Sequence, residues 1–255
     1  MRSRIVLTSA VAGAVLLAGC SFGWRTGEQA GPAPATTEGA VATAEAVAKL
    51  RLGNNFTEMS FRMNLDLGDR MTAVAWMDNP RKRFESSLKA SGGVTELRVI
   101  DDACYLNLGT GATSNGEPIG WFRLDLERIP ADFRIDFTPG HNDPGGSDRL
   151  IDAIVSAQIS GTEIGGTIDL AKIGVGSGVS VPPPKDGQWP EEAHRQPFTA
   201  SLDDRGYLVR FALSVNGADV LLRYGDFFTP VQVEPPPGAI PAPDPLYSLL
   251  GVVPA

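Results

Sequence analysis

The fold of this chain is decided by one stretch, Met59-Ser60-Phe61-Arg62-Met63-Asn64-Leu65-Asp66-Leu67. Its apolar residues alternate with polar ones without interruption, which is typical of a β-strand that has one buried face and one face in water. The dipeptide Gly68-Asp69 then supplies a turn. The stretch therefore opens a sheet whose apolar side must be covered by other parts of the chain.

Five short segments after this turn repeat the pattern of an apolar strand followed by a break. We expect strands at residues 71–78, 83–90, 94–100, 103–108 and 120–125. Consecutive strands with short connections form an antiparallel meander. The first half of the chain thus predicts a sheet of six neighbouring strands.

The last third of the chain is again rich in alternating strands. Residues 198–202 lead into a turn at residues 203–206, and residues 207–215 lead out of it. Asn216-Gly217 is typical of a two-residue hairpin turn, because both residue types tolerate a positive φ, and residues 218–224 form the partner strand. A further strand is expected from Gln158 to Leu170.

Two helices are expected beside the strands. The first covers residues 40–52 and ends at Gly53, with an apolar face of Val41, Ala44, Val47, Ala48 and Leu52. The second is capped by Ser147 or Asp148, with an apolar face of Leu150, Ile151, Ile154 and Val155. Nine or ten antiparallel strands must curl. The predicted fold class is α+β: a strongly curved antiparallel half-barrel with two or three helices covering its concave face.

The N-terminus has the pattern of a secretory signal. A basic start at Arg2 and Arg4 precedes an apolar run from Ile5 to Leu17, which is too short to span a bilayer permanently. The sequence Leu16-Leu17-Ala18-Gly19-Cys20 resembles the lipobox of bacterial lipoproteins, in which the cysteine is acylated and becomes the first mature residue. The alternative is an ordinary secretory signal in which Cys20 is incidental.

This pattern predicts four parts of the chain. Residues 1–19 are a signal peptide, residues 20–40 a flexible tether, residues 41–237 the folded domain and residues 238–255 a loosely packed C-terminal tail. Within the domain, Gly174 to Pro197 is rich in glycine and proline, and Pro182-Pro183-Pro184 is expected to form a stiff extended spacer in it. The domain is expected outside the cell, anchored to the outer face of the cell membrane.

Charge and cysteine content exclude several classes of partner and site. The formal charge of −8 becomes about −10 once Arg2 and Arg4 are removed, which disfavours nucleic acid and anionic phospholipid surfaces as direct partners. With Cys20 acylated, Cys104 has no partner within the chain, so a disulfide framework is excluded. We expect Cys104 to act as a small buried hydrophobic residue.

Signals for catalysis and for metal binding are poor. His141 and His194 both lie in predicted loops, so no helix holds metal donors at ligand spacing. Ser86 and Lys89 match a Ser-x-x-Lys nucleophile motif, but that chemistry needs a helical turn, and residues three apart on a strand face opposite ways. The sequence therefore predicts no enzyme activity, no cofactor and no metal.

Several strand motifs resemble a known family. The segment from Val99 to Leu106 followed by Gly120 to Leu124, the run from Gly161 to Thr167, the closing hairpin from Ser201 to Arg210 and the turn from Tyr224 to Val231 look like those of actinobacterial lipoproteins of the LprG/LppX type and their LolA-like relatives. The similarity covers roughly residues 41–236. The Gly/Pro-rich segment from Gly174 to Pro197 departs from the family pattern.

The resemblance implies a half-barrel wrapped round helices, enclosing an apolar cavity that holds the acyl chains of a lipid or lipoglycan in transit across the envelope. An envelope transporter is then a further candidate partner, besides the cell membrane itself through the Cys20 acyl chains. The candidate cavity residues are Met59, Phe61, Met63, Leu65, Met77, Leu150, Ile151, Ile154 and Val155. A protein-binding sensor or regulatory module with a filled core is the alternative, in which the flexible methionines only pack a core.

Overall fold

The computed structural model describes residues 14–15, 37–91, 93–109, 113–114, 117–118, 120–129, 134–135, 137, 146–174, 178–179, 181, 183–184, 187–215 and 218–249. Most of these belong to one sheet of 12 strands in the order β10-β11-β13-β14-β15-β2-β3-β4-β5-β6-β9-β16. All neighbours in it are antiparallel except β9 and β16, which are parallel. Cys20, most of the predicted tether and His141 lie outside the described residues.

The predicted meander is confirmed. It consists of β2 (Ser60–Asp66), β3 (Met71–Asp78), β4 (Arg83–Ala90), β5 (Gly93–Ile100), β6 (Ala103–Asn107) and β9 (Phe122–Leu124), which neighbour one another in chain order. Between β6 and β9 the short strands β7 (Thr113–Ser114) and β8 (Glu117–Pro118) pair with each other apart from the main sheet. Because the turns between these strands are short, each strand pairs with the strand that precedes or follows it in the chain.

The second half of the sheet continues from β2 in the other direction. Its strands are β15 (Ala218–Gly225), β14 (Leu208–Val215), β13 (Gln196–Leu202), β11 (Glu163–Ile168) and β10 (Ile154–Ser160). The three strands predicted after residue 197 are confirmed, although the Asn216-Gly217 turn lies outside the described residues. The single strand predicted from Gln158 to Leu170 was wrong: the chain turns at Gly161, whose φ of 65° suits glycine, and makes the β10–β11 hairpin.

The first helix, α1 (Thr37–Gly53), forms as predicted but packs through a different face. Ala46 and Leu50 are fully buried and Val47 of the predicted face packs against the core, whereas Val41 and Leu52 of that face are 64% and 76% exposed. A Cβ on Gly53 would lie 2.7 Å from the carbonyl oxygen of Gly206, so the end of α1 touches the turn between β13 and β14. Close approach to this turn, rather than side-chain hydrophobicity, selects the buried face.

The second helix is shorter than predicted. It is α2 (Asp148–Asp152), which holds the buried Leu150 and Ile151, and the chain then enters β10 at Ile154. Ile154 and Val155 therefore do not belong to a helix face, which corrects the prediction. Of two further short helices, α3 (Leu170–Ile173) directly precedes the Gly/Pro-rich segment, and η3 (Glu191–Arg195) lies near its C-terminal end.

The Gly/Pro-rich segment from Gly174 to Pro197 contains both a short strand and buried side chains. It contains the two-residue strand β12 (Gly178–Val179), and Val179 and Val181 are buried at 4% and 3% exposure. Strand β12 pairs in parallel with β1 (Ala14–Val15), which is the one described part of the predicted signal peptide. The segment thus contributes apolar side chains to the interior.

In the C-terminal tail predicted to be loosely packed, Leu246 and Tyr247 are buried, although Ile240 is 54% exposed. Strand β16 (Ile240–Pro241) extends the sheet beside β9, and α4 (Asp244–Leu249) follows. Tyr247 is 2% exposed, its hydroxyl oxygen accepts a 2.7 Å hydrogen bond from the backbone N–H of Asp125, and its ring lies 3.7 Å from the Arg128 guanidinium of η1 (Leu126–Arg128). The described residues after Pro237 therefore pack along the β9 edge of the sheet.

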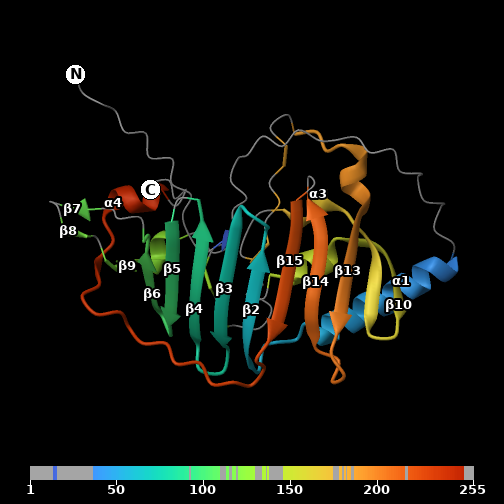
Figure 1. Cartoon of the computed structure of the whole chain (residues 1–255), viewed down its shortest axis with the longest axis horizontal. Coiled ribbons are helices and arrows are strands. Elements are labelled where there is room, and N and C mark those ends of the chain that lie inside the picture. Colours follow the sequence, from blue (N-terminus) through green and yellow to red (C-terminus); the bar gives the residue numbers. More distant parts are fainter. Residues whose placement is uncertain are drawn as a thin grey trace.

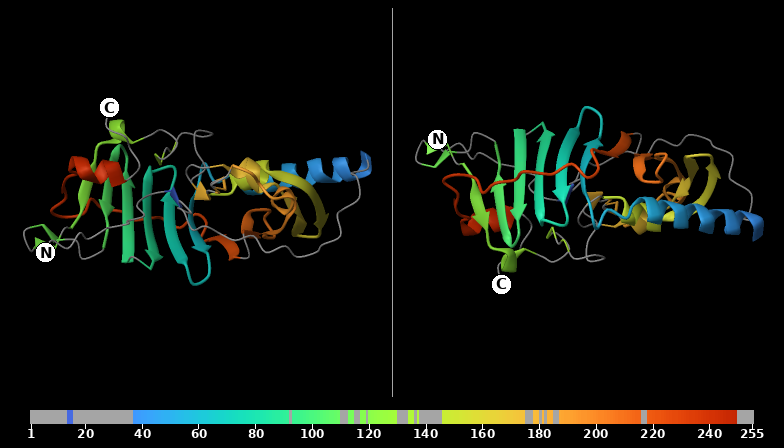
Figure 2. Two further views of the ribbon diagram at one scale, coloured as in Figure 1. Left: turned by 90° about the horizontal axis from the view of Figure 1, so that it is seen from above. Right: turned by 90° about the horizontal axis from the view of Figure 1, so that it is seen from below.

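The architecture is α+β, as predicted, and the sheet is an open and strongly twisted one. Figure 1 shows β9 and α4 at one end, with β10 and α1 at the other, so the two edge strands do not meet. The views in Figure 2 place α1 beside the yellow and orange half of the molecule, which contains β10–β15, and away from the β3–β6 strands. Among the described helices, none is long and apolar enough to span a membrane. The helix layer therefore serves one half of the sheet.

Candidate functional site

Strand register sorts the side chains of the meander into rows that cross the sheet on its apolar side, which we call the inner face. Residues paired across antiparallel neighbours lie on the same face. The first row contains Phe61, Met77, Phe84, Val99, Cys104 and Leu124, and the second contains Met63, Ala75, Ser86, Leu97, Leu106 and Phe122. The third contains Leu65, Ala73, Leu88 and Thr95.

The first row is a packed core. Phe61 and Met77 are each 1% exposed, and the Phe61 ring lies 4.6 Å from that of Phe56. Burial raises the pKa of the Cys104 thiol to about 12, so this cysteine is inert, as the sequence predicted. This row closes one end of the inner face.

The second and third rows are different at their centre. Ala73, Ala75 and Ser86 occupy adjacent positions there, and their side chains are too short to reach far above the sheet. Around them Met63, Met71 and Leu88 pack against the core yet remain only partly buried. We call Met63, Met71, Ala75, Ser86 and Leu88 the β2–β4 patch. Ala75 in it is 4% exposed, whereas the other four members keep residual access to solvent on a face that is otherwise buried.

The structure brings together the five predicted cavity residues that lie on or next to β2 and β3. Met59, Phe61, Met63, Leu65 and Met77 all point to the inner face, since they share the parity of the buried positions. Only Met63 of these five is more than 6% exposed. Met63 therefore belongs to the accessible patch, and the other four belong to its packed surround.

The predicted helix residues lie elsewhere. Leu150 and Ile151 of α2 are buried below the β15–β2 region, where the hydroxyl of Tyr224 donates a 3.0 Å hydrogen bond to Ser147 just before α2. Tyr224 is the register partner of Met63. Val155 is 42% exposed on β10, so it does not line an interior site, and Ile154 is the first residue of that strand.

Sequence reasoning missed four members of the patch: Met71, Ala75, Ser86 and Leu88. Met71 and Ala75 were already on the apolar side of their predicted strand, and Leu88 alternates in step with Phe84. Alternation alone could have placed each on the apolar side. Their meeting point required the register of β3 against β4, which pairs Ala75 with Ser86.

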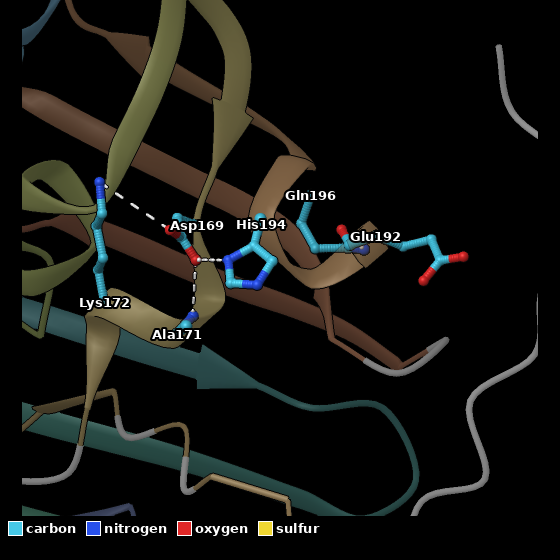
Figure 3. A network of polar contacts seen from close by, with 6 residues as sticks. All are labelled: Asp169, Ala171, Lys172, Glu192, His194 and Gln196. Carbon is cyan, nitrogen blue, oxygen red and sulfur yellow. Dashed lines mark hydrogen bonds and ion pairs between the residues drawn. The ribbon is translucent and has the colours of Figure 1, made fainter. Parts of the chain in front are cut away.

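A polar network elsewhere ties the two ends of the Gly/Pro-rich segment (Figure 3). Asp169 Oδ1 accepts a 3.0 Å hydrogen bond from the backbone N–H of Ala171 and lies 2.9 Å from Nδ1 of His194, while Lys172 Nζ lies 4.0 Å from Oδ2. Asp169 caps α3 and His194 belongs to η3, so the contact joins these two short helices. This contact therefore holds the start of the Gly/Pro-rich segment close to its end.

Ser86 and Lys89, which match the Ser-x-x-Lys motif, do not come together. Ser86 faces inward, whereas Lys89 pairs with the outward positions Thr72 and Val94, so they lie on opposite faces as predicted. Among the described residues, no three His, Cys, Asp or Glu side chains lie close enough to hold a metal ion.

No family model matches the chain, and neither does any curated protein. Two of the solved structures similar to it are mycobacterial lipoproteins. LprF from Mycobacterium bovis is 18% identical, with 76% of this chain and 98% of that chain covered and a TM-score of 0.44. LppX from Mycobacterium tuberculosis is 15% identical, with 75% and 99% covered and a TM-score of 0.42. Both are of the type that the strand motifs resemble, and at these scores they carry no argument about a ligand.

Proposed function

We propose that this protein is a membrane-anchored envelope lipoprotein that holds the acyl chain of a lipid or acylated glycolipid against the β2–β4 patch and performs no chemistry. One observation carries the proposal. Met63, Met71 and Leu88 remain partly exposed on the inner face, around the short side chains of Ala75 and Ser86. An apolar surface of this kind gains free energy when another apolar group covers it.

An acyl chain fits the chemistry of the patch. Covering apolar surface contributes about 25 cal/mol per Å² without any directional group, so a hydrocarbon tail needs no specific polar partner there. Methionine side chains are flexible and polarisable, and they adapt to partners of irregular shape. Met63 and Met71 are the accessible methionines at this place. The ligand class is therefore defined by its tail, with selection among head groups left to other residues.

Anchoring is part of the same proposal. Acylation of Cys20 would hold the domain at the outer face of the cell membrane, where its ligand is found and where an envelope transporter could exchange it. A single acyl chain binds a membrane only marginally, but two or three hold a protein stably. The lipobox resemblance at Leu16 to Cys20 supports this step.

The direct test is extraction of the purified protein. The chain beginning after Cys20 is produced in a bacterial host, extracted with organic solvent and examined by mass spectrometry. We expect about one acyl-bearing molecule per protein, or stoichiometric uptake of added fluorescent fatty acid. The proposal is contradicted if the extract contains no native lipid and the protein also fails to take up the added probe.

A filled-core module for protein binding is the second candidate. It is favoured by the low exposure of Met59, Phe61, Leu65 and Met77, which lies between 1% and 6% and leaves little of these side chains for a ligand. If this candidate is correct, the purified protein takes up no fatty acid, and added lipid leaves its stability unchanged. Stabilisation of the fold by added lipid, as expected for a ligand that binds only the native state, would reject this candidate.

A further inference from the structure

Helix α1 is apolar on two opposite sides. At 3.6 residues per turn, Thr43, Ala46, Leu50 and Gly53 fall within an arc of about 80°, and Val41, Ala44, Ala48 and Leu52 fall within a second arc of about 80° centred opposite the first. The second set is interrupted by no charged residue. We call it the outer stripe of α1.

The protein body covers only the first side. Ala46 and Leu50 are fully buried, and Thr43 exchanges hydrogen bonds with the backbone of Ala157 on the free edge of β10. The outer stripe faces solvent, with Val41 at 64% and Leu52 at 76% exposure. Figure 2 shows α1 lying along the outside of the molecule, at the end away from α4.

Charges beside the outer stripe neither attract nor repel strongly. Glu38 and Glu45 are balanced by Lys49 and Arg51. Both cations are held by the protein body, since Arg51 forms a 2.7 Å ion pair with Asp152 and Lys49 donates to the carbonyl of Gly161 at 3.4 Å. Any partner of the stripe is therefore recognised through apolar contact, and salt should have little effect on binding.

The stripe is too small for a stable contact between two copies of the chain. From Val41 to Leu52 it is about 16 Å long, and a helix face about 10 Å wide gives a total buried area of about 300–400 Å² for two copies. A stable protein interface needs roughly 1,000 Å² or more. The partner must therefore be one that a weak contact can hold.

The anchor proposed at Cys20 supplies such a partner. Cys20 lies 17 residues before Thr37, so the connecting chain has a root-mean-square span of about 20–25 Å if flexible and at most about 60 Å if extended. Tethering of this kind raises the effective concentration of the second contact to the millimolar range, so a weak second contact becomes populated. Helix α1 is the first described element after Cys20.

We propose that the outer stripe of α1 lies on the surface of the membrane that carries the Cys20 acyl chains, so that the domain has one preferred orientation there. This inference rests on the proposed anchoring and is independent of whether the β2–β4 patch holds a ligand. Val41 and Leu52 enter the boundary between head groups and acyl chains, while the small Ala44 and Ala48 let the helix backbone approach it. Orientation of the domain then fixes where the β2–β4 patch stands relative to the bilayer.

The test places a reporter dye on the stripe of the lipidated protein. Ala48→Cys and, as a matched control at a distant exposed turn, Asp69→Cys are labelled with the environment-sensitive dye NBD, and each protein is reconstituted into phosphatidylcholine vesicles containing doxyl-labelled phosphatidylcholine. Cys104 is 4% exposed and does not compete for label. We expect at least twofold stronger quenching at position 48 than at position 69. A second variant, Leu52→Glu in the Ala48→Cys background, should lower quenching to the control level.

Each other outcome has a definite meaning. Equal quenching at positions 48 and 69, or quenching unchanged by Leu52→Glu, overturns the inference. Energy transfer between copies labelled at position 48 at low surface density, lost in Leu52→Glu, overturns it in favour of packing between two copies. Mass spectrometry of the same samples reports acylation of Cys20, and an unmodified Cys20 overturns both this inference and the anchor. Lipid extraction tests ligand binding separately, so failure of the patch is distinguished from failure of the stripe.

Discussion

Strands β10–β15 carry their own helix layer, whereas the meander from β2 to β9 has an accessible apolar patch at its centre. In the first region Leu50, Ile168, Leu170 and Phe211 are fully buried between α1, α3 and the sheet. In the second, Met63, Met71 and Leu88 retain access to solvent around Ala75 and Ser86. Under the proposed function the first region stabilises the fold and the second binds the ligand, so variants in the two regions should respond differently.

The largest effect is expected from a cavity in the helix-covered region. Leu50→Ala removes a fully buried side chain between α1 and the sheet, and such truncations cost about 2–5 kcal/mol. The free energy of unfolding in urea measures the loss. Leu52→Ala, on the exposed side of the same helix, is the matched control and should change stability by less than about 0.5 kcal/mol. Similar losses for the two variants would show that α1 does not pack as described.

The next effect concerns the β2–β4 patch. Ser86→Leu places a large side chain at its centre, and we expect the affinity for added fatty acid to fall about tenfold, which is about 1.4 kcal/mol. Stability should hardly change, because Ser86 and the neighbouring Leu88 are only partly buried. Titration with a fluorescent fatty acid measures the affinity. Ser87→Leu, on the outer face of the same strand, is the control with unchanged affinity. A stability loss of about 1–3 kcal/mol for Ser86→Leu, as overpacking causes, would instead indicate a filled core.

A smaller effect should come from the β9 edge, where the C-terminal helix seals the sheet. Tyr247→Phe removes the hydroxyl that accepts from the backbone N–H of Asp125, and loss of one such hydrogen bond costs about 1 kcal/mol. Amide hydrogen exchange should quicken at Asp125, with no change at β13 and β14. Unchanged exchange at Asp125 would mean that this bond contributes nothing to the edge.

The smallest effect is a pH dependence in the helix-covered region. Partial burial raises the pKa of Asp148 at the start of α2, with the hydrogen bond from Asn54 opposing the rise. Because the folded pKa lies above the unfolded one, the folded state binds the proton more tightly, and stability falls as pH rises from the ordinary aspartate value of about 3.9 to the raised one. Asp148→Asn should lack this fall, so its stability relative to the parent should increase over that window, measured by urea denaturation at several pH values. A pH-independent difference would contradict the burial of this carboxyl.

Much of the sheet could be predicted from local pattern, because alternation with a period of two follows from the geometry of each strand alone. The errors occurred where local pattern permits two structures. Ile154 and Val155 continue an apolar run that suits either a helix or a strand, and pairing with β11 selects the strand. The residues from Ile240 to Leu249 seemed too irregular to pack, yet they are held by contacts to β9 and η1, more than 100 residues away in the chain.

The candidate site was predictable only in part. Met59, Phe61, Met63, Leu65 and Met77 could be assigned to one apolar face, since each strand shows its own parity. Sequence could not show that Ala75 and Ser86 are paired, so the gap in side-chain size at the centre of the face went unrecognised. The buried face of α1 was also predicted incorrectly, because two opposite sides of this helix are apolar.

The amino-acid sequence by itself determined the strands, the turns between them, the existence of α1 and the character of each side chain, since these depend on residues close together in the chain. Only the tertiary structure decided which side of α1 is buried, how the C-terminal residues seal the sheet and which short side chains meet on its inner face. Those outcomes depend on register and on close approaches between distant segments, such as Gly53 against the turn at Gly206, and no local periodicity encodes them.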